Sequence, residues 1–194
     1  MKKLLFILAL SMFSFANAQK GTVLVAGTVG FSSQKTSNSG VNSTQNSFSL
    51  FPKIGYQFTD NWTVGGEAGV SFQKSEYSSV ENKVNGYSVG AFVRYSKPLS
   101  DLFLIYADLG MGYGGLKETY VNDFNTPTTT INKSNGFYGS IAPALAINIK
   151  KGFCLNFGFG GISYNARKYD SGNKVNGFNF NFGQSFSAGI SKNF

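Results

Sequence analysis

Apolar residues alternate with small polar residues, at a period of two, from about residue 23 to the last residue of this chain. The final segment shows the pattern most clearly, because Phe178, Phe180, Phe182 and Phe194 share one parity while Gly, Ser and Asn fill the other. A helix would distribute these phenylalanines around its circumference, whereas a β-strand places them on one face. The chain is therefore predicted to be all-β.

Eight segments carry the alternation, and we predict one strand for each: 23–31, 48–58, 62–72, 87–95, 103–113, 137–149, 153–164 and 178–194. Short stretches rich in turn-forming residues separate some of these segments, at 59–61, 97–101 and 150–152. Long polar loops are predicted between the others, at 32–46, 74–85, 114–135 and 165–176. Short turns at one end and long loops at the other predict an up-and-down antiparallel meander.

The alternation alone leaves open which way the apolar face points. A secreted soluble barrel of the lipocalin type would turn the apolar set inward around a ligand, and the opposite set would then meet water. That opposite set is mostly Gly, Ser, Asn and Ala, and within the predicted strands its charged members are Lys53, Glu67, Arg94 and Asp108. Small residues instead suit the lumen of a narrow eight-stranded barrel, so we expect the apolar face to meet lipid.

Aromatic residues mark both ends of the predicted strands. Beside the long loops stand Phe31, Phe48, Phe72, Tyr87, Tyr113, Phe137 and Phe178. Beside the short turns stand Phe58, Trp62, Tyr95, Phe103 and Phe153, with Phe194 at the end of the last segment. Two aromatic girdles around an apolar band are typical of the two interfaces of a membrane. The stretch from Phe48 to Phe58 covers roughly 25 Å at a strand tilt of about 40°, which matches an outer-membrane hydrocarbon layer.

The first eighteen residues have the layout of a secretory signal peptide. Lys2 and Lys3 precede an apolar run over 4–15, and Ala16-Asn17-Ala18 fits the small-residue cleavage site. The apolar run is too short to span a bilayer as a helix. We therefore expect a signal peptide at 1–18 and one exported domain at 19–194.

This pattern resembles the small bacterial outer-membrane β-barrel proteins, namely the OmpX-like and OmpA-transmembrane-like barrels and the outer membrane protein beta-barrel domain group of Bacteroidota. The resemblance covers 19–194 and is one of pattern rather than of a specific motif. It implies an eight-stranded antiparallel up-and-down transmembrane β-barrel in the outer membrane of a Gram-negative cell, with short periplasmic turns and long extracellular loops. It also implies that the last strand is an assembly signal, in which Gly189, Ile190 and Phe194 fit the family pattern and Lys192 departs from it.

The four charged residues of lumen parity are predicted to form an ion-pair ladder. If Phe58 faces Trp62 across the tight turn, Lys53 lies opposite Glu67. A symmetric second hairpin would bring Glu67 near Arg94, and Asp108 would then lie diagonal to Arg94, one or two pairs nearer the loops. The four charges cancel, as expected where an unpaired charge is costly. Such a ladder would plug the pore, and separate solvation of the four charges by lumen water is the alternative.

Two prolines conflict with the predicted strands. Pro52 and Pro143 fall on the outward parity, where each would remove a ladder hydrogen bond in hydrocarbon. We expect a bulge or a register break at both positions.

Catalytic chemistry has little support in the sequence. There is no His, and Cys154 is the only Cys, so the chain offers no imidazole base, no His/Cys metal site and no internal disulfide. Among outer-membrane barrels, the enzymes rely on a catalytic His. Residues 110–115 match the G-x-G-x-x-G dinucleotide fingerprint, but no amphipathic helix follows them. We therefore expect no enzyme activity and no cofactor.

Three functions remain open. The first is a non-enzymatic membrane-anchored scaffold whose extracellular loops mediate surface interaction or envelope integrity. The second is a narrow OmpW-like transporter of small molecules, although a lumen lined by Gly, Ser and Asn argues against it. The third is an accessory subunit of an envelope or secretion complex.

The expected partners follow from the membrane location. They are outer-membrane lipid, lipopolysaccharide through loop cations such as Arg167 and Lys168, the barrel-assembly machinery and an unidentified extracellular or envelope protein. Nucleic acid is not expected as a partner, and the barrel is expected to be a monomer.

Overall fold

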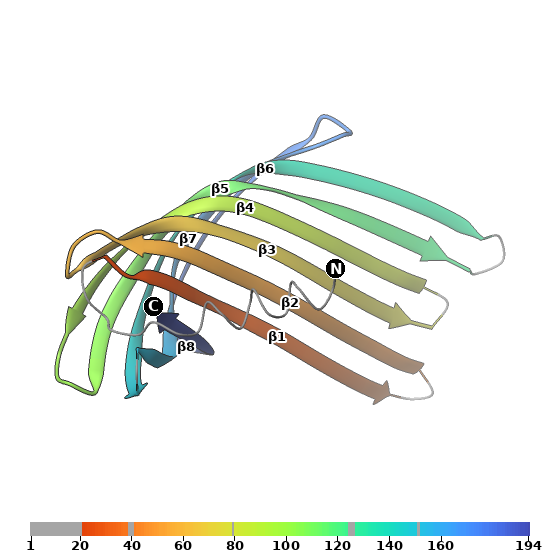
Figure 1. The fold of residues 1–194 in the computed structure, drawn as a ribbon. Coiled ribbons are helices and arrows are strands. Elements are labelled where there is room, and N and C mark those ends of the chain that lie inside the picture. Colours follow the sequence, from red (N-terminus) through yellow and green to blue (C-terminus); the bar gives the residue numbers. More distant parts are fainter. Residues whose placement is uncertain (1–20, 39–40, 79, 124–126, 151) are drawn as a thin grey trace, which may run out of the picture.

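The computed structural model describes residues 21–38, 41–78, 80–123, 127–150 and 152–194, which form a closed barrel of eight antiparallel strands in chain order (Figure 1). The strands are β1 Val23–Asn38, β2 Val41–Gln57, β3 Trp62–Tyr77, β4 Val80–Pro98, β5 Phe103–Asn122, β6 Thr128–Lys150, β7 Phe153–Tyr169 and β8 Lys174–Asn193. The predicted fold class is confirmed. The predicted signal peptide, 1–18, lies outside the described residues. No helix in the described part of the chain is long and apolar enough to cross a membrane.

Burial of the side chains follows the predicted parity. Outward residues such as Val29, Val89 and Met111 are more than half exposed, at 67%, 61% and 62%. The buried polar side chains all lie on the opposite parity: Gln57, Thr63, Arg94, Ser96, Asp108, Ser134, Asn156 and Ser191. An apolar exterior around a polar interior reverses the arrangement of a water-soluble barrel and is the arrangement that lipid selects.

The short turns are closed by hydroxyl groups, in the way that Ser and Thr commonly close turns. The hydroxyl of Thr59 accepts hydrogen bonds from the backbone N–H groups of Asn61 and Trp62, at 3.4 and 3.1 Å. The hydroxyl of Ser100 does the same for Leu102 and Phe103, at 3.3 and 3.1 Å. These two turns define what we call the turn end of the barrel, and the opposite end is the hairpin end.

The predicted long loops are wrong, because most of their residues continue the strands. Backbone pairing runs out to Asn38↔Val41 between β1 and β2 and to Tyr77↔Val80 between β3 and β4. It also continues to Asn122↔Thr128 in the third hairpin and Lys168↔Lys174 in the fourth. Polar residues occupy both faces of these extensions and apolar residues are few, so hydrophobic alternation fades there although the backbone ladder does not.

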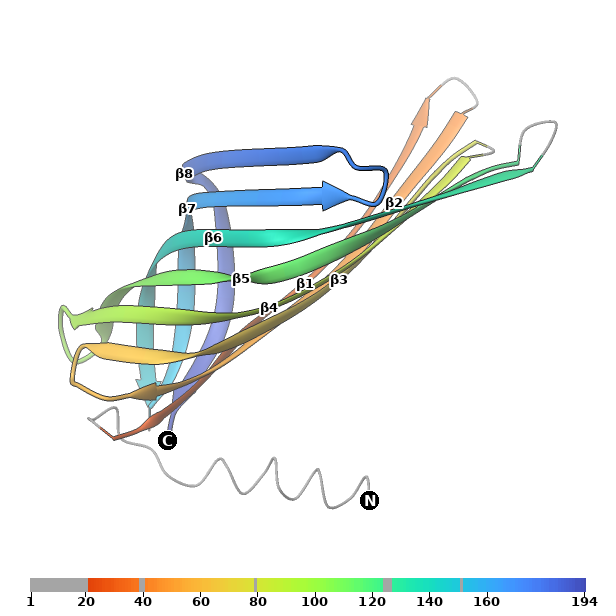
Figure 2. The same cartoon turned by 90° about the horizontal axis from the view of Figure 1, so that it is seen from above.

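The barrel wall splits at the hairpin end. Strands β1–β6 continue together as one curved sheet (Figure 2), and the β7–β8 hairpin stays paired with β6 up to Ser134↔Tyr169. The opening lies between β8 and β1. The seam between β1 and β8 pairs only four residues of each strand, from Leu24↔Asn193 to Gly27↔Ile190. The hairpin end therefore carries an extended sheet that is open between β8 and β1, beyond the closed part of the barrel.

The predicted aromatic girdles lie on the outer surface. Of the thirteen predicted girdle positions, eleven are exposed, and Phe153 and Phe194 are half-buried. The exposed positions are Phe31, Phe48, Phe72, Tyr87, Tyr113, Phe137 and Phe178 toward the hairpin end, and Phe58, Trp62, Tyr95 and Phe103 toward the turn end. Rings on adjacent strands pack together, with centroids 4.9 Å apart for Trp62 and Tyr95 and 5.2 Å apart for Tyr113 and Phe137.

The two prolines are accommodated differently. At Pro143 the β6–β7 register shifts between Ile141 and Ala144, so the expected break is present. At Pro52 the expected bulge or register break is wrong, because Leu50↔Val70 and Lys53↔Glu67 belong to one register. The β2–β3 pairing simply skips the proline region, and Pro52 keeps its pairing with Gly27 on the β1 side. A missing N–H donor thus interrupts one ladder without adding a residue.

Candidate functional site

The charged residues of lumen parity meet inside the barrel. Lys53 on β2 lies opposite Glu67 on β3, and its ammonium nitrogen is 2.8 Å from Glu67 Oε2. Arg94 on β4 lies opposite Asp108 on β5 and donates two hydrogen bonds to its carboxylate, from Nε to Oδ1 at 2.6 Å and from Nη2 to Oδ2 at 3.0 Å. A bidentate guanidinium–carboxylate contact combines charge with fixed geometry.

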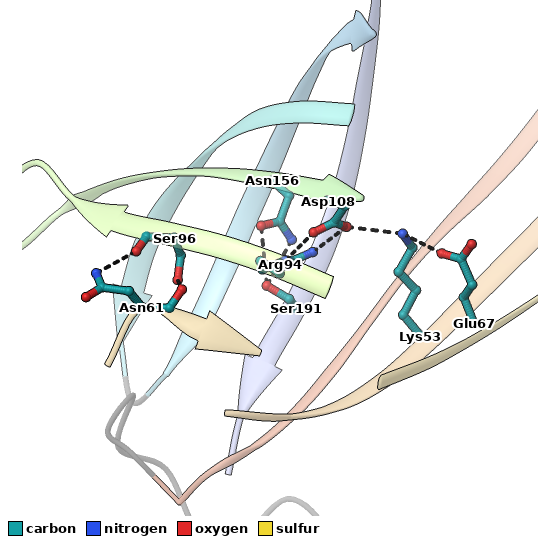
Figure 3. Close-up of polar contacts among 8 residues, drawn as sticks. All are labelled: Lys53, Asn61, Glu67, Arg94, Ser96, Asp108, Asn156 and Ser191. Atoms are coloured by element: carbon teal, nitrogen blue, oxygen red, sulfur yellow. Dashed lines mark hydrogen bonds and ion pairs between the residues drawn. The ribbon is translucent and has the colours of Figure 1, made fainter. Parts of the chain in front are cut away.

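The two pairs are linked across the lumen, because Lys53 Nζ also lies 3.1 Å from Asp108 Oδ2 (Figure 3). The order along the network is therefore Glu67, Lys53, Asp108, Arg94. The predicted contact of Glu67 with Arg94 is wrong, since Glu67 pairs with Gly90 and Arg94 pairs with Thr63. The predicted diagonal placement of Asp108 is also wrong, because it lies directly opposite Arg94. The β3–β4 register moves Arg94 four residues closer to the turn end than a symmetric hairpin about Glu67 would place it.

Tyr138 extends the network to β6, and no sequence pattern indicated this residue. Its hydroxyl donates a hydrogen bond to Glu67 Oε1 at 2.8 Å. Gly90 and Gly112 pair with each other and occupy the row between these two residues. A Cβ at Gly112 would lie 2.6 Å from the Tyr138 hydroxyl, so the ring crosses where two strands lack side chains. Only the register brings these glycines into one row, and a single-sequence pattern does not contain that information.

Arg94 and Asp108 are the most deeply buried charges of the network, at 6% and 5% exposed. The guanidinium carbon of Arg94 lies 3.7 Å from the centroid of the Tyr106 ring, which adds a cation–π contact. Tyr106 in turn packs in a buried cluster with Ala144 and Ala146. Removing one partner of a buried pair leaves an uncompensated charge and costs about 3–5 kcal/mol. This pair is therefore the least replaceable part of the network.

The turn-end half of the lumen is filled, and the hairpin-end half is hollow. Toward the turn end, Asn156 on β7 bonds Ser191 on β8 at 2.9 Å, and Asn61 bonds the backbone of Ser96 at 2.8 Å (Figure 3). Cys154 is half-buried and packs against the Tyr106 cluster, as a small filler would. Toward the hairpin end lies a cavity of about 550 Å³ lined largely by Gly, Ala and Ser, with the four charged residues on its wall. Within the described residues, no group of three His, Cys, Asp or Glu could hold a metal ion.

The residues of the predicted assembly signal lie at the β1–β8 seam. Ile190 pairs with Gly27, and Phe194 exchanges two backbone hydrogen bonds with Val23, at 2.9 and 3.0 Å. A Cβ at Gly189 would lie 3.0 Å from a Thr28 side-chain carbon, so this position favours a residue without one. The role of these residues in assembly stays a prediction.

Comparisons with known proteins agree with this architecture. Residues 4–189 match the family described as "Outer membrane protein beta-barrel domain". No curated protein matches the chain. Among solved structures, the translocator domain of the autotransporter NalP from Neisseria meningitidis has a TM-score of 0.51 at 16% identity, over 91% of this chain and 64% of that one. A major outer membrane protein from Thermus thermophilus has a TM-score of 0.51 at 12% identity, over 91% of this chain and 100% of that one.

The attachment invasion locus protein Ail of Yersinia pestis is also similar, with a TM-score of 0.46 at 19% identity, over 91% of this chain and 100% of that one. At such identities, the two structures with a TM-score of 0.51 support the fold alone. The family match covers most of the chain, and the closed eight-stranded barrel with an apolar exterior agrees with it. This chain belongs to the outer membrane protein beta-barrel domain family and is a β-barrel of the outer membrane.

Proposed function

We propose that this protein is a non-enzymatic scaffold, anchored in the outer membrane by a plugged barrel, whose long hairpins act outside the cell on a surface ligand or an envelope partner. The observation that carries the proposal is the charge network across the lumen, from Glu67 through Lys53 and Asp108 to Arg94. A lumen crossed by buried, mutually bonded charges is poorly suited to transport. Function then falls to the parts of the chain outside the membrane.

The hairpins support this role by their size and chemistry. We take them as extracellular, because barrels of this class have short periplasmic turns and longer extracellular connections. They extend the β1–β6 sheet beyond the aromatic girdle and expose large side chains such as Tyr77, Tyr120 and Ile131, at 58%, 43% and 52%. Exposed aromatics on a rigid sheet can anchor a partner.

The first test is conductance of the purified barrel in planar bilayers. The plugged lumen predicts silent membranes, whereas regular single-channel steps from the wild-type protein would favour the OmpW-like transporter instead. Heat-modifiable electrophoretic mobility serves as the folding control, since the folded barrel should migrate differently before and after boiling.

The second test shortens the β5–β6 hairpin by replacing residues 118–132 with Asn-Gly, a sequence suited to a two-residue turn. Cross-linking in native membranes should identify a partner that the full chain retains and the shortened barrel loses, at equal surface level. Replacing residues 170–172 of the β7–β8 connection with Asn-Gly keeps Tyr169 opposite Asn173 and gives a matched control with a second altered hairpin. Identical cross-links from all three proteins would refute a scaffold role for the β1–β6 sheet.

A further inference from the structure

Every lysine beyond the hairpin-end girdle lies on the outward parity of its strand. Each stands two or four residues past an outward aromatic of the same strand, as Lys74 does past Phe72 and Lys117 past Tyr113. The set comprises Lys35, Lys74, Lys83, Lys117, Lys133, Lys168 and Lys174. Arg167, at a similar height, has the opposite parity and lines the lumen cavity. The hairpins thus turn their lysines toward the surrounding membrane surface.

The height of these lysines matches a headgroup layer. Four residues advance about 13 Å along a strand, or about 10 Å perpendicular to the membrane at a tilt of about 40°. The aromatic girdle marks the edge of the hydrocarbon, so the ammonium groups lie just beyond it. Cationic side chains at that level interact with the anionic groups of lipids.

Lys117 on β5 and Lys133 on β6 lie directly opposite each other without a shared carboxylate, as Lys168 and Lys174 do on β7 and β8. Lys117 and Lys133 in addition line a recess in which Lys168 and Lys174 take no part. Like charges in that position destabilise a strand pair. Lys74 and Lys83 are opposite each other as well, but both form ion pairs with Glu81. Among the described residues, no carboxylate lies within 4.0 Å of the ammonium of Lys117 or Lys133.

A recess of about 270 Å³ lies between these two lysines on the outer face. Its other walls include Asn85 and Asn135, whose amides supply hydrogen-bond donors, and the outward Tyr87 of the girdle. Tyr87 can lie close to β5 because its partner there is Gly115, where a Cβ would be 2.8 Å from the ring. Two cations, two amides and an adjacent ring form a site suited to a phosphate carried on a lipid.

We propose that this recess binds a phosphate of an outer-leaflet lipid of the lipid A type, with Lys117 and Lys133 as its cationic ligands. Asp170 also lines the recess, and its backbone N–H donates to the Lys133 carbonyl at 3.0 Å. With that carboxylate counted, the two lysines leave the recess a net positive charge. The inference rests on the extracellular orientation of the hairpins and is independent of any protein partner.

The test measures binding of fluorescent lipid A to the purified barrel in neutral detergent, with dephosphorylated lipid A as the second probe. The wild-type protein should prefer the phosphorylated lipid. Lys117→Gln should weaken that binding roughly fivefold, and Lys117→Gln with Lys133→Gln by about thirtyfold, since each cation near an anionic surface contributes a similar amount. The matched control is Arg167→Gln, which removes one positive charge at a similar height but from the lumen face, and it should bind like wild type.

Four results would overturn the proposal. The first is equal binding of the two lipids by the wild-type protein. The second is a double variant that binds lipid A with wild-type affinity while its heat-modifiable shift is unchanged. The third is a loss of lipid A affinity in Arg167→Gln as large as that in Lys117→Gln. That loss would show that net charge, rather than this recess, determines binding. The fourth is displacement of the fluorescent lipid A by inorganic phosphate added at the same concentration. Such competition would show a site for free phosphate and would overturn the lipid assignment. Because no protein partner takes part, these outcomes are independent of the scaffold tests above.

Discussion

Charges on the two faces of the barrel wall are compensated in different ways. Inside, Lys53, Glu67, Arg94 and Asp108 cancel, and each has an opposite charge within 3.1 Å. Outside, Lys117 and the lysine opposite it share a recess with no ion pair in the described part of the chain. A buried charge has to find its partner within the protein, because leaving it unpaired in a low dielectric is costly. A charge at the membrane surface can take its partner from lipid or water, so the chain is free to leave it unpaired.

The largest effect should come from breaking the inner compensation at its most buried point. Asp108→Ala removes both acceptor oxygens of Arg94 and one partner of Lys53. We expect the free energy of unfolding in neutral detergent to fall by about 3–5 kcal/mol, measured by urea titration. The double variant Arg94→Met with Asp108→Leu should recover part of this loss, because it removes the stranded charge as well. A double variant no more stable than Asp108→Ala would contradict the claim that the loss comes from an unpaired Arg94 charge in the lumen.

A smaller effect is expected at the more accessible end of the network. Glu67→Ala removes one partner of Lys53, which keeps Asp108, and it leaves the Tyr138 hydroxyl without its acceptor. The expected loss is about 1–3 kcal/mol in the same titration, the cost of an unsatisfied buried group. Tyr138→Phe is the control, because it removes the hydroxyl and keeps the ring over the glycine row. If Glu67→Ala lowers the free energy of unfolding as much as Asp108→Ala does, burial does not determine the energetic contribution of these contacts.

The smallest effect is expected in the outward cluster of Lys74, Glu76, Glu81 and Lys83, whose charges form ion pairs with one another. Among the described residues of the hairpin end, no other outward cluster is compensated by ion pairs within the chain. Hydrogen bonds from Lys74 first, and then from Lys83, lower the pKa of the Glu81 carboxyl below its ordinary value. A lowered pKa means that this contribution to stability is present above the unfolded-state pKa and is lost as pH falls through the folded one. The Glu81 side chain is partly exposed, so salt should weaken the shift. Carbon-detected NMR titration should show a pKa nearer the ordinary value in Lys74→Gln, whereas an unchanged titration would contradict the cluster.

The faces of this barrel could be predicted from the sequence more fully than the lengths of its strands. Alternation from Trp62 to Phe72 correctly assigns each side chain to lipid or lumen, because successive strand residues must point to opposite sides. The same strand runs on to Tyr77, and no sequence pattern indicated that extension. Beyond the girdle both faces meet water, so polar residues occupy both parities and the alternation carries no contrast. Patterns of hydrophobicity report where a strand is buried rather than where it ends.

The sequence by itself also determined which charged residues would face the lumen, since parity alone places Lys53, Glu67, Arg94 and Asp108 there. Only the tertiary structure decided how they pair. A tight turn fixed the Lys53–Glu67 register as expected. The β3–β4 hairpin set Glu67 opposite Gly90, the short β4–β5 turn set Arg94 opposite Asp108, and closure of the barrel brought Lys53 across to Asp108. The physical reason is that parity is a property of each residue's own backbone, whereas register depends on how distant strands align and on the shape into which the sheet closes.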